Sequence, residues 1–490
     1  MHRFRTVKIW PGKEYPHLPP RPTSHFVAHP VEKRILLIVT SLASFLVPYT
    51  VSSIAVALPA IGADFNLDAV SMGWVTSAYL LTAAVCIIPF GKLADMYGRK
   101  RLFILGNILF TAGSLLAALS WAGYAIIAAR IVQGLGGSLV FATSIAIVTA
   151  VFPPGERGRA IGIITATVYA GLSLGPFLGG IITQHFGWPG IFLVNVPIGI
   201  LVLIATLVSI PGEWAEPGSH GFDLVGAVLY CLMLVGALYG LTLLPTPGGI
   251  LWMVAGAVFL YGFVRWERRR PSPMLDLSLF RNNPTFIFSN IAAMINYSVV
   301  FAVGFLMSLY LQYNRGLDPQ TAGVILVTMP VVQMVVSPLA GHLSDSIEPR
   351  IIATAGMACT TAGLGLMILV SQATPVVFII AGLMILGLGY GLFSSPNTNA
   401  IMSAVAVHHL GVASAMVSTM RAVGQMVSMA IAMMVFSIIL GSRPISPPVY
   451  PELQLSVTVT FSLFLLLGLV GIWASYSRGS IHPDHGEVDT

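Results

Sequence analysis

The charged residues that could form specific interactions gather in one short stretch, FGKLADMYGRKR, which begins at Phe90. It holds Asp95 and, four to six positions later, three basic residues of which Arg99 is the first. A carboxylate and a guanidinium can form a charge-assisted hydrogen bond, which is stronger than a bond between neutral groups. Gly91 and Gly98 would allow the chain to turn tightly. The stretch predicts an ionic clasp between two helices that forms in one conformation and breaks in another. The alternative is that these charges only fix the orientation of the chain.

Two arginines lie inside otherwise apolar runs. Arg130 is followed by Gln133, three residues on, and Arg421 by Gln425, four residues on, so each pair shares a helix face. A charge inside a membrane span costs about 2.5–3.5 kcal/mol on insertion scales, so it usually faces a cavity or a partner. We therefore expect both arginines to line a central pathway.

Other polar residues inside apolar runs are weaker candidates for the same pathway. They are Tyr49, Thr50, Asn296, Tyr297, Gln312, Gln333, Asn397 and Asn399. The alternative for each is a hydrogen bond between two helices.

Signs of enzyme chemistry are missing from the sequence. We find no phosphate-binding glycine loop, no nucleophile elbow and no zinc-binding His–Glu spacing. The three cysteines, Cys86, Cys231 and Cys359, fall in separate apolar runs, which gives no disulfide framework and no thiolate metal site. We expect neither an enzyme nor a bound metal or cofactor.

The composition identifies the environment of the chain. Only 9% of the 490 residues are charged and 56% are hydrophobic, with a mean hydropathy of +0.87, whereas a soluble domain has about 25% charged residues. Runs of about 20 apolar residues are long enough for a helix to cross a bilayer. We predict an all-α integral membrane protein with fourteen spans, at residues 35–60, 71–93, 102–120, 123–151, 158–183, 190–210, 223–243, 248–266, 285–313, 320–343, 351–371, 375–402, 411–440 and 453–476.

Basic residues orient these spans, because short cytoplasmic loops collect Lys and Arg. With the N-terminus inside, twenty of the 24 Lys and Arg residues fall on the inner side. We expect a multi-pass protein of the cell membrane with both termini cytoplasmic. The net charge of +6 is then a sign of topology, and nucleic acid is not an expected partner.

The motifs repeat along the chain. GHLSDSIEPR, which contains Gly341, Asp345 and Arg350, matches the stretch around Asp95, and two further matches follow at nearly the same offset. The second copy lacks the basic run, so its clasp should be weaker. We predict a tail (1–34), a six-helix bundle (35–210), a linker with two extra helices (211–284), a second six-helix bundle (285–476) and a tail (477–490).

Four motifs in order resemble the major facilitator superfamily. GKLADMYGRKR resembles its loop motif, ARIVQGLGGS its fourth-helix motif with a buried arginine, and YAGLSLGPFLGG the fifth-helix motif of its antiporters. IFLVNVPIG and the two extra central spans are similar to the fourteen-span drug:proton antiporters. The resemblance implies a monomeric secondary transporter that alternates between two openings and exports small amphipathic compounds.

The fifth-helix motif would have a mechanical role in such a transporter. Its glycines leave a groove where another helix can approach, and its proline can bend the helix. The resemblance implies a gating helix built on Gly171, Gly175, Pro176, Gly179 and Gly180. The alternative is close packing alone.

One position departs from the family pattern. The fourteen-span antiporters typically carry an aspartate in the first span, where this chain has Thr50 within VPYTVSSIAVALP. All eighteen acidic residues map to tails, loops or span ends. A proton is the one coupling ion to consider, and without a buried carboxylate we expect weak coupling. The alternatives are a carrier of organic anions or metabolites, a channel and a membrane-embedded enzyme. The duplicated layout disfavours the channel, and the lack of clustered reactive residues disfavours the enzyme.

Overall fold

The computed structural model of the protein describes residues 30–209, 212–213, 222–270, 274, 277–344, 346–406 and 409–479. These residues are almost entirely helical, and their sole β pairing is an isolated bridge between Asp68 and Pro444. The helices are α1 (Pro30–Phe65), α2 (Ala69–Tyr97), α3 (Arg99–Ala118), α4 (Gly123–Val151), α5 (Pro154–Phe186), α6 (Pro189–Leu193), α7 (Asn195–Ser209), α8 (Leu224–Thr242), α9 (Pro247–Glu267), α10 (Pro284–Leu309), α11 (Pro319–Leu326), α12 (Thr328–Leu343), α13 (Pro349–Ile368), α14 (Val376–Ser403), α15 (Leu410–Ile439) and α16 (Tyr450–Tyr476). Short 3₁₀ turns cover Leu277–Phe280 and Pro447–Val449.

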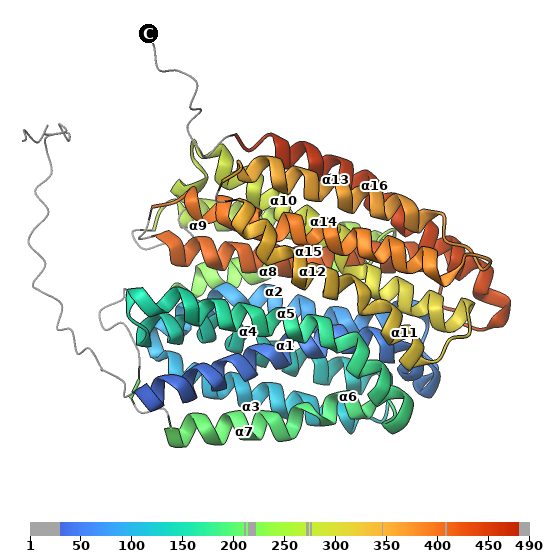
Figure 1. Ribbon diagram of the computed structural model, residues 1–490, viewed down its shortest axis with the longest axis horizontal. Helices are drawn as coiled ribbons and strands as arrows, with labels where there is room; N and C mark the ends of the chain where they lie inside the picture. The colour runs from blue at the N-terminus through green and yellow to red at the C-terminus, as the bar shows by residue number, and fades with distance from the viewer. Residues whose placement is uncertain are drawn as a thin grey trace, which may run out of the picture.

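Fourteen segments of this described part are long and apolar enough to cross a membrane. Six of them, formed by α1–α7, make the N-half, and six more, formed by α10–α16, make the C-half. In Figure 1 the N-half lies below in blue and green, and the C-half lies above in yellow to red. The predicted all-α fold with fourteen spans and two extra central helices is confirmed.

Three of the spans are not single α-helices, and one of them, Pro319–Leu343, is divided at Val327 into α11 and α12. The span that begins at Pro189 breaks at Val194 into α6 and α7, because Pro197 has no N–H to continue the hydrogen-bond ladder. The span that begins with α10 ends in a π-helical turn, Tyr310–Asn314. Such turns widen the helix locally and redirect its side chains. Apolar periodicity alone predicted none of these features.

Side-chain caps fix where several helices begin. The carboxylate of Asp68 accepts a hydrogen bond of 2.7 Å from the backbone N–H of Ser71 at the start of α2. Asn283 and Asp318 cap α10 and α11 in the same way. These groups satisfy N–H donors that have no partner within the helix. The turn between α2 and α3 is made by Gly98, whose φ of 110° is a conformation that favours glycine.

The molecule has two distinct ends. At the first, the starts of α1 and α5 are joined by an ion pair of 3.1 Å between Lys33 and Glu156. The same end holds the turn at Gly98 and the end of α16, where Thr285 donates to the backbone oxygen of Arg478. We name it the basic end, because the predicted inner loops lie there, and we name the other end the distal end. The basic end is at the left in Figure 1.

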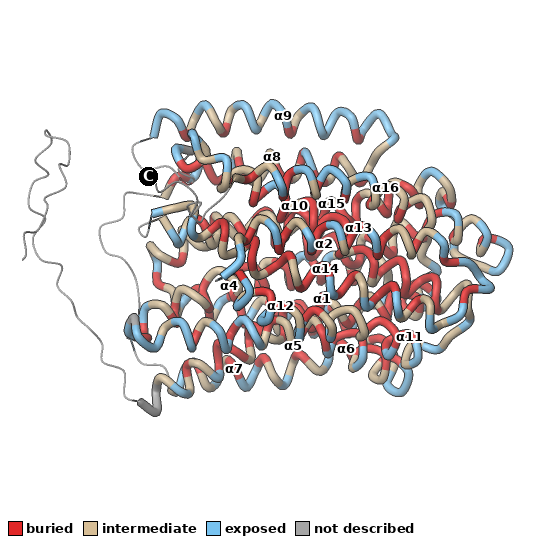
Figure 2. The backbone as a smooth tube through the Cα atoms, turned by 45° about the horizontal axis from the view of Figure 1, so that its top comes forward, coloured by how far each residue is buried: buried red, intermediate tan, exposed pale blue. Residues whose placement is uncertain are grey.

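The two extra helices form a hairpin on one side of the bundle. Helix α8 packs against both α2 of the N-half and α15 of the C-half, and α9 packs against α8. Glycines allow the close approach of α8 and α9, since a Cβ at Gly236 would lie 2.6 Å from the Cα of Gly256. Figure 2 shows α9 as an outermost helix with a largely exposed surface. The hairpin therefore covers one seam between the halves and presents α9 to lipid.

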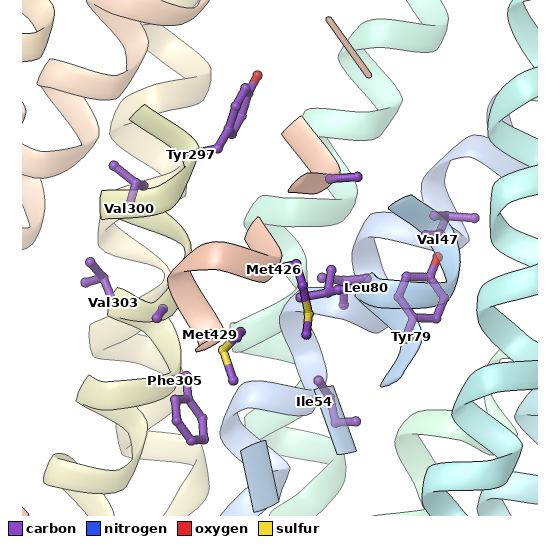
Figure 3. Packing of buried hydrophobic residues seen from close by; sticks show 14 of the residues in the cluster. Val47, Ile54, Tyr79, Leu80, Tyr297, Val300, Val303, Phe305, Met426 and Met429 are labelled. Atoms are coloured by element: carbon purple, nitrogen blue, oxygen red, sulfur yellow. The ribbon is translucent and has the colours of Figure 1, made fainter. Parts of the chain in front are cut away.

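Apolar side chains fill the space between the halves on the distal side. Figure 3 shows Met426 and Met429 of α15 between Leu80 of α2 and Phe305 of α10. Both methionines are fully buried. Flexible thioether chains suit an irregular gap of this kind, so here they serve as packing between the halves.

Candidate functional site

Two adjoining cavities lie between the N-half and the C-half. The larger has a volume of about 130 Å³ and the smaller about 70 Å³. Val51 of α1, Leu172 of α5 and Gln425 of α15 line both, so the cavities share a wall. Each of the three lies near the middle of its helix. The cavities thus lie at mid-depth between two repeated bundles, where transporters of this design bind their substrates.

Arg421 is the one charged residue that lines these cavities among the described residues. Its Nε–H donates to the hydroxyl of Tyr297 at 3.2 Å, and its guanidinium carbon lies 5.4 Å from the centre of that ring. Within the described part of the chain the structure shows no ion pair to Arg421 and no further hydrogen bond from it. Four of its five N–H donors are therefore available to a molecule in the smaller cavity.

The larger cavity has aromatic walls and a buried amide. Tyr297 and Tyr390 pack edge to face with ring centres 5.7 Å apart, and both line the cavity. Gln333 of α12 also lines it and is only 5% exposed. The side-chain nitrogen of Gln333 has no hydrogen-bond partner in the described structure. A buried donor without a partner is costly, so this amide is suited to a ligand or a water.

Of the predicted pathway residues, the structure brings four to the cavities. Arg421 and Gln425 line the smaller one, and Tyr297, Gln333 and again Gln425 line the larger one. Most of the other lining residues had no signal in the sequence. Among them are Tyr390, which is one tyrosine in an apolar run, and Thr76, whose hydroxyl has no hydrogen-bond partner among the described residues.

Arg130 occupies a different place. It is fully buried within the N-half, where its Nε–H donates to the backbone oxygen of Val75 at 2.9 Å. Its guanidinium lies 4.5 Å from the ring centre of Tyr79 and donates a hydrogen bond to the side-chain oxygen of Gln133. The side-chain nitrogen of Gln133 donates to the hydroxyl of Ser114. Neither Arg130 nor Gln133 lines a cavity; the Tyr79 ring lines the smaller one. In this conformation the pair joins α2, α3 and α4.

The side chains of Thr50 and Tyr49 point into the N-half, where they pack between its helices. The Thr50 hydroxyl donates to Leu46 and accepts a hydrogen bond of 2.9 Å from Asn195 of α7. Tyr49 stacks on Phe45 at 5.7 Å. Neither residue lines a cavity, so the position that carries an aspartate in the similar antiporters here serves the contact between α1 and α7.

The predicted asparagines lie inside the C-half. Asn296 donates to the sulfur of Met357, Asn397 to the backbone oxygen of Ser289, and Asn399 to the hydroxyl of Ser344. These are the helix–helix hydrogen bonds of the alternative interpretation. Asn397 also accepts a hydrogen bond of 2.9 Å from Arg478, whose fully buried side chain anchors the end of α16.

The predicted clasp is closed in this conformation. Arg99 donates two hydrogen bonds to one oxygen of Asp95, at 2.8 and 2.9 Å, and a third to the backbone oxygen of Ala146 at 3.3 Å. Residues of α2, α3 and α4 are therefore joined at the basic end of the N-half. Glu213, which the sequence did not single out, accepts from the backbone N–H groups of Lys100 and Arg101 at the start of α3.

The second copy of the clasp differs from the first. Asp345 lies outside the described residues. Arg350 does not pair with a carboxylate in the described part; its guanidinium lies 5.1 Å from the ring centre of Tyr476 in α16. A Cβ at Gly341 would lie 2.8 Å from the hydroxyl of Ser395, while at Gly91 it would meet nothing within 4 Å. Close packing against a side chain thus exists at Gly341 and not at Gly91.

Helix α5 closes the distal side of the seam. A Cβ at Gly180 would lie 2.5 Å from the backbone oxygen of Pro319, and Gly323 lies equally close to Pro176. Gly171 and Gly179 are similarly packed against α1, and Gly175 meets Ser52 there. At the basic end of α5 the glycines are not closely packed, because a Cβ at Gly158 or Gly162 would meet nothing within 4 Å. The predicted gating helix thus has closely packed glycines at its distal end, while at its basic end the glycines are open and Glu156 pairs with Lys33 of α1.

Hydrogen bonds also join the N-half and the C-half. Gln312 of the π turn donates to Val56 of α1 at 2.9 Å, and Tyr313 donates to Pro59 at 3.3 Å. Nearer the middle, Ser173 of α5 donates to Pro330 at 3.0 Å. On the basic side of the larger cavity, the hydroxyls of Tyr169 of α5 and Ser394 of α14 lie 3.1 Å apart. The halves are therefore joined by several hydrogen bonds at the distal end and by this contact on the basic side of the larger cavity.

Comparison with known proteins identifies the family of the chain. Residues 40–429 match the Major Facilitator Superfamily. The chain therefore belongs to this superfamily and resembles its drug-efflux branch.

Individual relatives place it more closely. It is 35% identical to the riboflavin transporter RibZ of Clostridioides difficile over 80% of this chain and 85% of the relative. It is also 35% identical to the multidrug resistance protein Stp of Mycobacterium tuberculosis, over 81% and 74%. The tetracenomycin C resistance and export protein of Streptomyces glaucescens is 31% identical over 76% and 70%. Among solved structures, a peptide transporter POT in complex with sulfate covers 93% of this chain and 96% of its own, with a TM-score of 0.68 and 15% identity, which supports the fold alone.

Proposed function

We propose that this protein is a secondary active transporter that exports small amphipathic compounds by alternating access. The observation that carries the proposal is the pair of cavities at mid-depth between the two halves. Hydrogen bonds from Gln312 and Tyr313 join the halves on the distal side of these cavities, and the hydroxyls of Tyr169 and Ser394 meet at 3.1 Å on the basic side of the larger cavity. Alternate opening of the two sides would expose the same cavities first to one side of the membrane and then to the other.

In the proposed orientation the protein spans the cell membrane, with its basic end and both termini on the cytoplasmic side. The basic loops support this orientation, since short cytoplasmic loops collect Lys and Arg. The conformation described here is then closed to the outside, where Gln312 and Tyr313 join the halves. Relatives named for multidrug resistance, riboflavin transport and tetracenomycin C export support a small-molecule substrate.

A second candidate is a carrier of organic anions or metabolites that is not coupled to protons through a buried carboxylate. The specific observation is the lining of the cavities, in which Arg421 has no acidic neighbour among the described residues. A proton-driven drug exporter of the usual kind needs a group there that gains and loses a proton, and an arginine stays protonated.

Counterflow in liposomes tests the proposal. Purified protein is reconstituted, and the vesicles are loaded with riboflavin, with an amphipathic cationic dye or with an aromatic acid. Uptake of the labelled form of the same compound is then measured. A carrier accelerates exchange when the opposite side is loaded, whereas a channel does not. No counterflow with any compound of a broad panel would contradict the transporter assignment.

A further inference from the structure

The two cavities differ in chemistry, and together they describe a ligand. The smaller contains the guanidinium of Arg421, and the larger is walled by Tyr297 and Tyr390. Gln425, one turn beyond Arg421 on α15, lines both. A molecule that fills both must therefore have an apolar, ring-like part and a polar part, separated by about the width of one side chain.

The size of the larger cavity indicates what the apolar part is. Its volume is about 130 Å³, and an apolar cavity of about 150 Å³ binds benzene. The edge-to-face arrangement of Tyr297 and Tyr390 suits a third ring, because aromatic rings prefer offset or T-shaped contacts with centres roughly 4.5–7 Å apart. The cavity thus fits a single aromatic ring.

The polar part must be an acceptor. Arg421 offers four N–H groups with no partner in the described structure, and a planar guanidinium binds a carboxylate through two parallel hydrogen bonds. Tyr297 cannot neutralise the charge, because its hydroxyl only accepts one hydrogen bond from Nε. A second donor, the buried side-chain nitrogen of Gln333, also lacks a partner in this part of the protein. A cationic ligand would meet a fixed positive charge and no carboxylate among the described lining residues.

We infer that these cavities bind an aromatic organic anion, with its ring packed against the Tyr297–Tyr390 pair and its acidic group on Arg421. This inference rests on the proposed function, in which the cavities are the substrate site. It narrows the substrate from small amphipathic compounds to acids. The amide N–H of Gln333 would donate to an acceptor carried by the ring.

Binding of three probes of one shape tests the inference. Benzoate carries the charge, benzamide is its neutral analogue and benzylammonium is a cation with the same ring. Binding to the purified full-length protein is measured by competition against radiolabelled benzoate. We expect benzoate to bind at least about tenfold more tightly than benzamide, as a charge-assisted pair requires, and benzylammonium not to compete. Equal competition by benzylammonium would overturn the inference.

Variants locate the effect. Arg421→Gln should abolish the preference for benzoate over benzamide. Arg421→Lys should retain part of it, because the charge stays while the paired donors are lost. Arg443→Gln is the matched control, since Arg443 lies beyond α15 at the distal end and pairs there with Glu452. An unchanged preference in Arg421→Gln would overturn the inference. Should that variant not fold, Gln333→Met keeps the test open, because it must weaken the binding of 4-hydroxybenzoate, whose ring hydroxyl can accept a hydrogen bond from the amide, several-fold more than the binding of benzoate. Equal effects on the two compounds would overturn the inference.

Counterflow separates this inference from the proposed function. Benzoate binding that depends on Arg421, without counterflow of any compound, contradicts transport but supports the ligand class. Counterflow of a cationic dye together with no benzoate preference supports transport and overturns the ligand class.

Discussion

The side-chain amide of Gln312 in the C-half donates a hydrogen bond of 2.9 Å to the backbone oxygen of Val56 in the N-half. The same amide donates to Ser308, one turn earlier on α10, so its orientation is fixed from both sides. It belongs to the π turn that ends α10. A contact of this kind must break whenever the distal end opens. It therefore acts as a latch of the closed state.

Loss of this latch should shift the protein towards the state that is open at the distal end. Gln312→Met removes the donor and keeps the size, and one hydrogen bond is worth about 0.5–1.5 kcal/mol, or about two- to tenfold in population. Labelling of Ala55→Cys, which lines the larger cavity, by a reagent applied from the distal side should rise by this factor in a variant whose native cysteines are replaced by serine.

Gln454→Met is the control for the latch. Gln454 donates to Val370 at 2.6 Å at the same end, but both residues belong to the C-half. Labelling in this variant should stay unchanged. An equal rise in both variants would mean that Gln312 stabilises the fold in general and does not latch the distal end.

The ionic clasp predicts a separate phenotype. Asp95→Asn keeps the shape of the side chain but weakens its two hydrogen bonds from Arg99, which loosens the junction of α2, α3 and α4. Transport should fall about tenfold while expression and membrane insertion stay normal. Glu156→Gln, which removes an exposed ion pair at the same end, should have little effect, since exposed pairs contribute about 0–1 kcal/mol. A normal rate in Asp95→Asn would leave the charges a role in topology alone.

Arg130 should matter for stability more than for binding. Arg130→Gln leaves the backbone oxygen of Val75 and the side chain of Gln133 without the guanidinium, at a cost of about 1–3 kcal/mol for each buried group left unsatisfied. The midpoint of thermal unfolding of the purified protein should fall clearly. In Arg421→Gln it should change little, because that guanidinium faces a cavity. Lost ligand affinity in Arg130→Gln at an unchanged midpoint would place Arg130 in the pathway after all.

The lining of the cavities also predicts how transport responds to protons. No Asp, Glu or His lines either cavity in the described part of the chain, so no side chain there can gain and lose a proton near neutral pH. An imposed inward proton gradient should drive only weak concentrative efflux from reconstituted vesicles. Robust efflux that a protonophore abolishes would show that a proton binds elsewhere in the protein.

The sequence predicted the membrane fold well, because fourteen apolar runs and their basic loops leave few arrangements. Apolar periodicity could not predict the breaks inside spans; the π turn at Tyr310–Asn314, for example, contains no proline or glycine that would mark a departure from a regular α-helix. The site was harder. Periodicity correctly placed Arg130 and Gln133 on one helix face, but it could not say that this face meets Tyr79 and Ser114 instead of a cavity. Tyr390 was missed because an uncharged aromatic residue is common in any span.

The central claim is that the contact between the halves at the distal end must break in every transport cycle. Ser77 of α2 donates to the sulfur of Met433 of α15 at 3.3 Å across this seam. The decisive measurement is counterflow by Ser77→Cys/Met433→Cys, in a variant without native cysteines, before and after reaction with a bifunctional methanethiosulfonate, whose arm bridges thiols that are too far apart for a direct disulfide. The compound used is the one that the unmodified protein exchanges fastest. A control crosslink, Asp64→Cys/Trp188→Cys, replaces a contact of 2.6 Å at the same end but within the N-half. We predict that the crosslink between the halves stops exchange of the compound, that a reductant restores it, and that the control crosslink leaves exchange unchanged. Full exchange with the halves covalently joined at Ser77 and Met433 would contradict alternating access between them.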